Sequence, residues 1–432
     1  MRNKAYFISI LLSLPIYLIA QTGHVLQGNG ATNFSMGGAA TGQALDISGT
    51  LNWNPAGIAV FDQTKLSINA GLFFAAPEVS SSVHTPVGTV FSGTTKDQKG
   101  MSVIPSVAAV FGKPDSKHTF GVQAFGVSGF GVDYPMSQDN PITLPQNNGG
   151  FGHVYSNYQL LQAGVTYAFS FTDQFSIGVA PVFNYAALQV KPNPLASPSL
   201  TLGYPESNNA SAIGFGVQAG IYFHSESGFK AGASYKSTQH FGDLSLKNTY
   251  LDGSDAGTVK FNMDFPAIYS AGIGYSTDKI DVGLDYRYID YANTNGFSKT
   301  GWTQTAAVAG FGWKSISVLS AGLQFKGIEH FPLRVGYTYS SNPVPSETAF
   351  FSTSAPAIIQ HAVQVGLGWE ASERVTVNLG YHYGFSGEVS GPLLSPFFIT
   401  ETNPYGKIEG SSVTHKMTTS MLLLGVDFTF GR

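Results

Sequence analysis

The side chains that could do chemistry are scattered along this chain and form no recognisable catalytic set. Its ten histidines include no pair at the helical spacing of a metal site, and no Gly-x-Ser-x-Gly sequence surrounds a serine. The glycines of GFGVQAG (214–220) lie in an alternating stretch, which is typical of a strand and not of a phosphate-binding loop. We therefore expect no enzymatic activity, cofactor or metal site, and expect His224, His382 and His415 in an interior or in loops.

Charged residues offer binding chemistry instead, because six of them fall at the polar positions of alternating stretches. A lone buried charge is costly, so these six are expected to pair with one another. The alternative is that Arg287 or Arg334 holds a ligand carboxylate through a charge-assisted hydrogen bond. The six are Asp285, Arg287, Arg334, Glu370, Arg374 and Asp427.

The stretches that carry these charges alternate with a period of two, which predicts β-strands with one apolar and one polar face. In ERVTVNLGYHYGF (373–385) the apolar face holds every second residue from Val375 to Phe385. The opposite face carries Gly, Thr and Asn beside single charges, whereas a soluble sandwich would carry many Lys and Glu. This pattern favours strands that face a crowded interior.

Composition points to a membrane β-barrel. Only 11% of the residues are charged and 13% are aromatic, with 51 glycines, whereas about 25% charged residues is usual for a soluble domain. After the first 20 residues no apolar run reaches the roughly 18 residues of a membrane helix, so strands must do the crossing. The net charge of −4 does not indicate a nucleic-acid partner, and the lack of cysteine excludes disulfides and lipid attachment through cysteine.

The chain begins with a predicted secretory signal, residues 1–20. Arg2 and Lys4 precede an apolar stretch that Pro15 interrupts, and Ala20–Gln21 is a plausible cleavage point. An uncleaved helical anchor is the alternative.

Short and long connections alternate along the rest of the chain, which is typical of a bacterial outer-membrane barrel with tight periplasmic turns and long external loops. We read 79–100 as the outer part of the first external loop, because a further single strand would make the strand count odd. The last strand ends on Phe430, an aromatic terminus suited to the barrel-assembly machinery, although Gly431 and Arg432 follow it. The fourteen predicted antiparallel strands, in a barrel expected to be monomeric, are 65–75, 101–111, 118–129, 158–171, 174–188, 211–224, 228–249, 257–276, 279–291, 315–327, 331–341, 361–371, 373–385 and 416–430.

Residues 21–60, which precede the barrel (61–432), are predicted to fold into the lumen as a hatch. A fourteen-stranded barrel is wide enough to need a plug or to hold a channel, and this segment is too apolar for a solvated linker. In NWNPAG, the residues Asn54, Pro55 and Ala56 are expected to make a tight turn. A flexible periplasmic tail is the alternative.

The chain resembles the FadL-type outer-membrane transporters of long-chain fatty acids and toluene-like hydrocarbons. The resemblance is carried by GGAATGQALDISGTLNWNPAGIA, IPSVAAVFG, FGVQAFGVSGFGVDY, FPAIYSAGIGYSTDKIDVGLDYRYIDY, PLRVGYTYSSNPVPSE and HAVQVGLGWEASERVTVNLGYHYGF, which span nearly the whole mature chain. It implies passive transport of hydrophobic small molecules through hatch rearrangement, with an inward kink of the third strand that opens the wall towards lipid.

The third predicted strand, 118–129, and the residues after it are rich in glycine: Gly121, Gly126, Gly129 and Gly131. Glycine weakens a strand and often marks a bulge or bend, so a lateral gate is one interpretation. The other is that glycine relieves crowding in the lumen.

Apolar cargo is expected to contact Phe34 and Trp53 in the hatch and the loop pairs Phe350–Phe351 and Phe397–Phe398. Capture would occur at the lipopolysaccharide surface. A general diffusion porin and a structural or adhesive surface barrel are the alternative functions. Single-channel conductance would separate the porin, and binding of an amphiphile inside the barrel would separate the adhesin.

Overall fold

A computed structural model of the chain describes residues 23–84, 88 and 90–431. The signal predicted at 1–20 lies outside the described residues. Within the described part, no helix is both long and apolar enough to cross a membrane.

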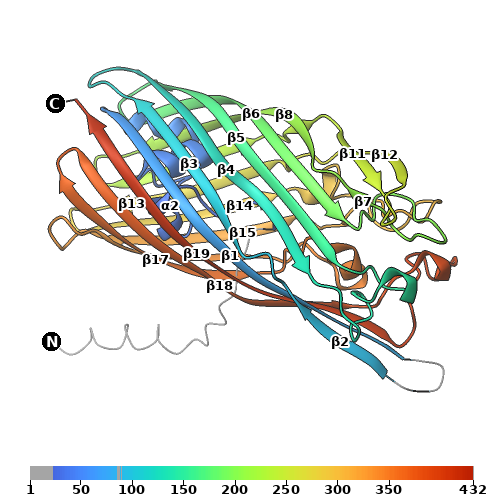
Figure 1. The fold of residues 1–432 in the computed structure, drawn as a ribbon. Coiled ribbons are helices and arrows are strands. Elements are labelled where there is room, and N and C mark those ends of the chain that lie inside the picture. The colour runs from blue at the N-terminus through green and yellow to red at the C-terminus, as the bar shows by residue number, and fades with distance from the viewer. Residues whose placement is uncertain (1–22, 85–87, 89, 432) are drawn as a thin grey trace, which may run out of the picture.

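Within the described residues, fourteen antiparallel strands form a closed wall, which confirms the predicted fourteen-stranded barrel; Figure 1 shows this wall from the side. The wall closes because β1 pairs with β3 on one side and with β19 on the other. In order around the ring the strands are β1 (Thr64–His84), β3 (Met101–Phe111), β4 (His118–Tyr134), β5 (Val154–Ser170), β6 (Phe175–Lys191), β8 (Ala210–His224), β9 (Phe229–Lys236), β13 (Ile268–Ser276), β14 (Ile280–Ile289), β15 (Ile316–Phe325), β16 (Leu333–Ser340), β17 (His361–Ser372), β18 (Val375–Gly391) and β19 (Ser411–Phe430).

Burial follows the predicted alternation, as β14 illustrates. Leu284 and Tyr286 are exposed on the outer surface, whereas Asp285 and Arg287 between them are buried. Large apolar side chains are exposed on the outside of every wall strand from β3 to β17. An outer surface of this kind is typical of a β-barrel whose wall faces the lipid of a membrane.

Two predicted strands are shorter in the wall than expected. The prediction 228–249 divides into β9, β10 (His240–Phe241) and β11 (Leu244–Thr249), and 257–276 divides into β12 (Asp255–Phe261) and β13. The strands β11, β12 and β7 (Glu206–Ser207) form a separate small sheet at the loop end of the barrel (Figure 1). Pro266 has no N–H to give to a ladder, and it lies in the stretch between β12 and β13.

The first external connection is partly a hairpin. β1 continues to His84, and β2 (Val90–Lys96) pairs with this extension only, so the number of wall strands stays at fourteen. The hairpin projects from the same end as the long loops (Figure 1). The remaining loops contain short 3-10 helices, namely η2 (Gln146–Asn148), η3 (Tyr291–Asn293), η4 (Ser346–Ser352) and η5 (Pro396–Phe398).

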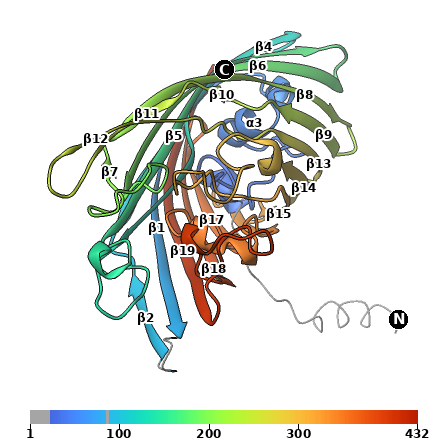
Figure 2. The ribbon, with the colours of Figure 1, turned by 90° about the vertical axis from the view of Figure 1, so that its right-hand side faces the viewer.

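Residues 23–60 lie inside the ring of strands (Figure 2) and are buried almost throughout. They form the short helices α2 (Ala31–Ser35) and α3 (Ile47–Trp53) and the 3-10 helix η1 (Pro55–Val60). Asp46 caps α3 by accepting a hydrogen bond from the backbone N–H of Gly49 at 2.8 Å. We call residues 23–60 the N-terminal segment.

Candidate functional site

The ladder between β3 and β4 stops halfway along the wall. It runs from the pair Phe111–Phe120 to the pair Ser106–Phe125, and residues 101–105 of β3 then pair with β1 alone. Beyond Phe125, β4 keeps its ladder with β5, with a bulge between Gly126 and Ser128, and has no ladder with β3 among the described residues. The wall therefore has a gap between the outer halves of β3 and β4.

The N-terminal segment bonds to β4 where β3 leaves it. The backbone N–H of Leu26 donates to the carbonyl of Val127 at 3.0 Å, and that of Gly129 donates to the carbonyl of His24 at 3.2 Å. These bonds satisfy β4 backbone groups that would otherwise be buried without partners. The start of the segment thus replaces β3 on the inner side of the gap.

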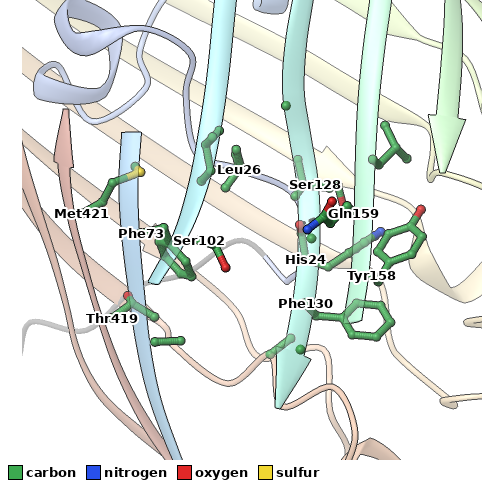
Figure 3. Close-up of a pocket in the computed structure, with 18 of the residues that line it drawn as sticks. His24, Leu26, Phe73, Ser102, Ser128, Phe130, Tyr158, Gln159, Thr419 and Met421 are labelled. Carbon is green, nitrogen blue, oxygen red and sulfur yellow. Dashed lines mark hydrogen bonds between the residues drawn. The ribbon is translucent and has the colours of Figure 1, made fainter. Parts of the chain in front are cut away.

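A cavity of about 360 Å³ lies at this gap (Figure 3), within the size range of small-molecule sites. From inside the barrel it is lined by residues that include His24, Phe34 and Met421. It is also lined by residues exposed on the outer surface: Val103 (60% exposed), Tyr185 (51%) and Leu161 (42%). The cavity therefore passes through the wall.

The four glycines of the predicted gate divide into two groups. Gly126, Gly129 and Gly131 line the cavity at the edge of the gap. Gly121 lies in the paired part of the ladder, where an added Cβ would meet the side chain of Leu51 at 2.7 Å. Gly121 therefore makes room for the N-terminal segment, and the other three border the opening.

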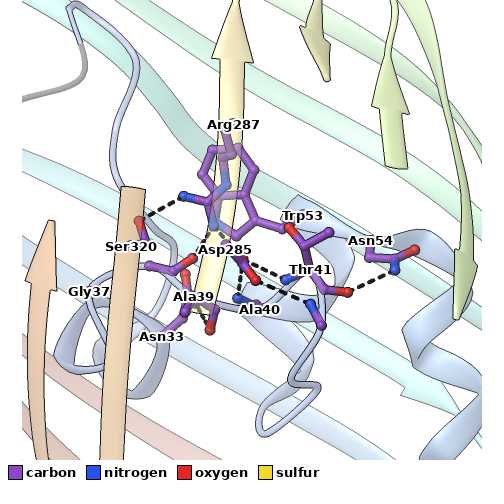
Figure 4. Close-up of polar contacts among 12 residues, drawn as sticks. Asn33, Gly37, Ala39, Ala40, Thr41, Trp53, Asn54, Asp285, Arg287 and Ser320 are labelled. Carbon is purple, nitrogen blue, oxygen red and sulfur yellow. Dashed lines mark hydrogen bonds and ion pairs between the residues drawn. The ribbon is translucent and has the colours of Figure 1, made fainter. Parts of the chain in front are cut away.

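Asp285 of β14 holds the N-terminal segment on the opposite side of the lumen (Figure 4). Its carboxylate accepts hydrogen bonds from the backbone N–H groups of Ala40 (2.8 Å), Thr41 (2.7 Å) and Gly42 (3.2 Å). Arg287 pairs with the same carboxylate at 2.8 Å. We call this arrangement of Asp285 and Arg287 the clamp.

Arg287 and Trp53, two predicted ligand contacts, lie against each other in the clamp. The guanidinium carbon is 3.7 Å from the centroid of the Trp53 ring. Arg287 also donates to the carbonyl of Gly38 and to the hydroxyl of Ser320. The ion pair between Asp285 and Arg287 confirms the expected pairing of lumen charges for these two residues. Arg287 is 1% exposed and contacts the N-terminal segment. Neither Arg287 nor Trp53 lines the cavity.

Nine consecutive wall strands, β6 to β18, each place an inward-facing glycine against the N-terminal segment. A Cβ at Gly336 would lie 2.1 Å from the backbone nitrogen of Gly37, and a Cβ at Gly272 would lie 2.6 Å from that of Gly42. Only glycine permits such an approach of backbone to wall. We call this set the glycine girdle: Gly178, Gly220, Gly232, Gly272, Gly283, Gly322, Gly336, Gly366 and Gly380.

The predicted turn at Asn54 contacts the girdle. The Asn54 side chain accepts from the N–H of Ala56 at 3.1 Å and donates to the carbonyls of Thr41 and Ile221, each at 2.9 Å. Pro55 lies at the start of η1, where its fixed φ is suited to a helix start.

These features can be compared with known proteins. The model of the family described as outer membrane protein transport protein (OMPP1/FadL/TodX) matches residues 20–430. The chain belongs to this family. Membership places it among integral outer-membrane transporters of hydrophobic compounds, a family of transport channels and not of enzymes. No curated protein matches the chain in sequence.

Solved structures show the same fold at low identity. The toluene transporter TodX of P. putida is 16% identical, with a TM-score of 0.68, and the match covers 94% of this chain and 99% of TodX. A FadL homologue from Pseudomonas aeruginosa is 13% identical, with a TM-score of 0.71 and coverage of 95% and 100%. The toluene transporter TbuX of Ralstonia pickettii is 17% identical, with a TM-score of 0.63 and coverage of 94% and 99%.

Arg334, the other predicted carboxylate ligand of this FadL/TodX-family chain, lies away from the cavity. It donates to Gln324 at 2.6 Å and to Asn378 at 2.9 Å, and Asn378 donates to Asp427 at 2.7 Å. This network lies near the ends of the strands that the short turns connect. Glu370 and Arg374 are exposed there, where β17 and β18 meet in a tight turn.

The two predicted phenylalanine pairs occupy different environments. Phe350 and Phe351 are buried in an apolar cluster that includes Trp302, whose ring is 5.2 Å from that of Phe351. Phe397 and Phe398 are 82% and 53% exposed. The first pair packs the loops together, and only the second presents an apolar surface to the outside.

Sequence reasoning missed Lys99, which borders the cavity beside Asp97. Both lie in the connection between β2 and β3, outside any alternating strand, so periodicity gave no signal for them. The Asp97 carboxylate accepts the N–H of Asp133 of β4 at 2.6 Å, and the N–H of Gln98 donates to the carbonyl of Asp133 at 2.9 Å. Residues 97–99 thus bridge the outer end of the gap.

Proposed function

We propose that this chain carries hydrophobic small molecules, long-chain fatty acids or aromatic hydrocarbons, from the cell surface into the cavity and out sideways between β3 and β4. Residues 21–60 act as the hatch that blocks the direct route. The observation that supports this path is a single cavity lined by lumen residues such as Met421 and by lipid-facing residues such as Val103.

A lateral path is favoured because exposing an apolar cargo to water costs free energy. Each buried CH₂ is stabilised by about 0.8 kcal/mol relative to water, so an apolar cargo that passes from cavity to lipid avoids that loss. At the gap no β3–β4 ladder bond has to break beyond the pair Ser106–Phe125. A route through the N-terminal segment would instead have to disrupt the clamp.

Similarity to the toluene transporters TodX and TbuX supports the class of cargo. The exposed pair Phe397–Phe398 supports capture at the lipopolysaccharide surface. Assembly by the barrel machinery, function as a monomer and the absence of catalysis belong to the same proposal.

A crosslink across the gap tests the lateral path. The chain contains no cysteine, so Val103→Cys with Gly129→Cys can be joined by a bifunctional thiol reagent. The matched control joins Val107→Cys to Ala124→Cys, which face each other in the paired ladder.

We expect the first crosslink to lower uptake of labelled fatty acid or toluene at least about tenfold, and the control crosslink to leave uptake unchanged. Both barrels should remain folded, as judged by resistance to protease. Equal uptake across both crosslinks would contradict lateral release, and a large steady single-channel conductance would contradict the hatch in favour of a porin.

A further inference from the structure

Lys99 carries the positive charge of the cavity. Among the described residues that line it, Lys99 is the single lysine or arginine. The arginines that the sequence suggested, Arg287 and Arg334, are absent from that lining. Among the described lining residues, Lys99 is therefore the permanent cation that an anionic group in this cavity could pair with.

The Lys99 ammonium is held by neutral oxygens. Its Nζ donates to the backbone carbonyl of Ser156 at 2.7 Å and to the side-chain oxygen of Asn157 at 2.9 Å, both on β5. An ammonium has three N–H donors, so one makes no hydrogen bond to oxygen here, and the Tyr155 ring lies 5.0 Å from Nζ. Within the described chain Lys99 forms no ion pair.

Nearby carboxylates are committed to other partners. Asp97 accepts the N–H of Asp133 on one oxygen and the N–H of Lys99 itself, at 3.1 Å, on the other. Asp133 pairs with His153 at 2.5 Å. Burial is the larger influence on Lys99 and lowers its pKa to about 8. The negative charges of Asp97 and Asp133 act in the opposite direction and raise the pKa.

Gly131 of β4 gives Lys99 its position. A Cβ added at Gly131 would lie 2.3 Å from Nζ of Lys99 and 2.7 Å from its Cε. The lysine thus crosses β4 at a glycine to reach β5, and its charged end lies at the outer rim of the gap. The outward-facing residues below it, Val103 and Leu161, are apolar.

We propose that Lys99 binds the anionic head group of an amphiphilic cargo, a carboxylate on an alkyl chain, while the chain occupies the apolar cavity. This inference rests on the proposed lateral path and selects, from its two classes of cargo, the fatty acid over the hydrocarbon. The head group sits at the outer rim, and the alkyl chain extends between β3 and β4 at the depth of the lipid.

Binding of a matched pair of ligands tests the proposal. Decanoate and 1-decanol have the same chain length and differ in charge. Their dissociation constants are measured by calorimetry with the full chain in phosphatidylcholine nanodiscs, and the heat from empty nanodiscs is subtracted. We expect Lys99→Met to weaken decanoate binding about tenfold, or about 1.4 kcal/mol, and to change decanol binding less than about twofold.

Lys96→Met is the control, since Lys96 is an exposed lysine of β2 outside the cavity lining; it should change neither ligand's affinity. Lys99→Gln replaces Lys99→Met if the latter does not assemble. Raising the pH from 7 to 9.5 should reproduce the loss of decanoate affinity in the wild type, because Lys99 becomes neutral above its pKa. Lys99→Arg should still bind decanoate more tightly than decanol at pH 9.5, because arginine stays charged.

If Lys99→Met weakened the binding of decanoate and decanol equally, or weakened neither, Lys99 would not bind the head group. Binding of decanol would in that case still support the proposed path. Failure of the wild type to bind either ligand would overturn the proposed function as well. A third measurement adds the anionic lipid phosphatidylglycerol to the nanodiscs. If the Lys99-dependent preference for decanoate over decanol disappears, the site belongs to an anionic lipid head group, and a cargo carboxylate is contradicted.

Discussion

The two sides of this lumen are built in opposite ways. From β6 to β18 the wall offers glycines, and the backbone of the N-terminal segment lies directly against them. At β19, β1, β3, β4 and β5 the wall offers side chains around a cavity, which also reaches one residue each of β6 and β18, and one ladder is incomplete. Close backbone packing tolerates little movement, since protein interiors are packed like crystals. We therefore expect the segment to be fixed on the first side and any movement to be confined to the second.

The clamp gives the largest expected effect. Asp285→Asn leaves Arg287 buried without its carboxylate, and breaking a buried pair by removing one partner costs about 3–5 kcal/mol. We expect residues 23–60 to become accessible to protease and the barrel to unfold at lower temperature, as measured by limited proteolysis with mass spectrometry and by thermal unfolding. Asp243→Asn, at an exposed residue between β10 and β11, should have no effect.

A double substitution sharpens this test. Adding Arg287→Gln to Asp285→Asn removes the uncompensated charge, so the double variant should be less unstable than the sum of the two single variants. If residues 23–60 in Asp285→Asn were as protected as in the wild type, the fixed side would not depend on the clamp.

The girdle gives the next largest effect. Gly336→Ala places a methyl group 2.1 Å from the backbone nitrogen of Gly37, and backbone cannot turn aside as a side chain can. Overpacking of this kind costs about 1–3 kcal/mol, so we expect a lower unfolding temperature and faster proteolysis of the N-terminal segment. Gly242→Ala is the matched control, because an added Cβ there would have no neighbour closer than 4.0 Å.

Much of the wall could be predicted from the sequence because its strands face lipid on one side and polar groups on the other, which forces a period of two. The same rule explains the error at 228–249 and 257–276. Leu244 and Leu246 of β11 continue the alternation and are buried in the same apolar core as the wall. A periodic pattern reports a buried face, but it does not report which neighbour covers that face.

The site was harder to predict because its features depend on contacts between distant segments. Gly121 and Gly129 look alike in the sequence, yet one lies against Leu51 and the other borders the cavity. Phe350 and Phe397 likewise differ only in what covers them. Lys99 lies in a short connection whose position depends on Gly131 and on β5, and no local pattern records either.

The smallest expected effect, Gly129→Ala, decides whether the two sides differ as the structure indicates. An added Cβ at Gly129 has one close neighbour, the carbonyl oxygen of Tyr158 at 3.0 Å, and the φ of Gly129 is not in the left-handed region. A small shift of β5 relieves the contact, and alanine in a strand recovers about 0.5–1 kcal/mol of backbone entropy. We therefore expect a change in stability within about 1 kcal/mol and unchanged protection of residues 23–60, measured as for Gly336→Ala. A loss as large as that of Gly336→Ala would mean that the gap side holds the segment as tightly as the girdle does, and that movement is not confined to the gap.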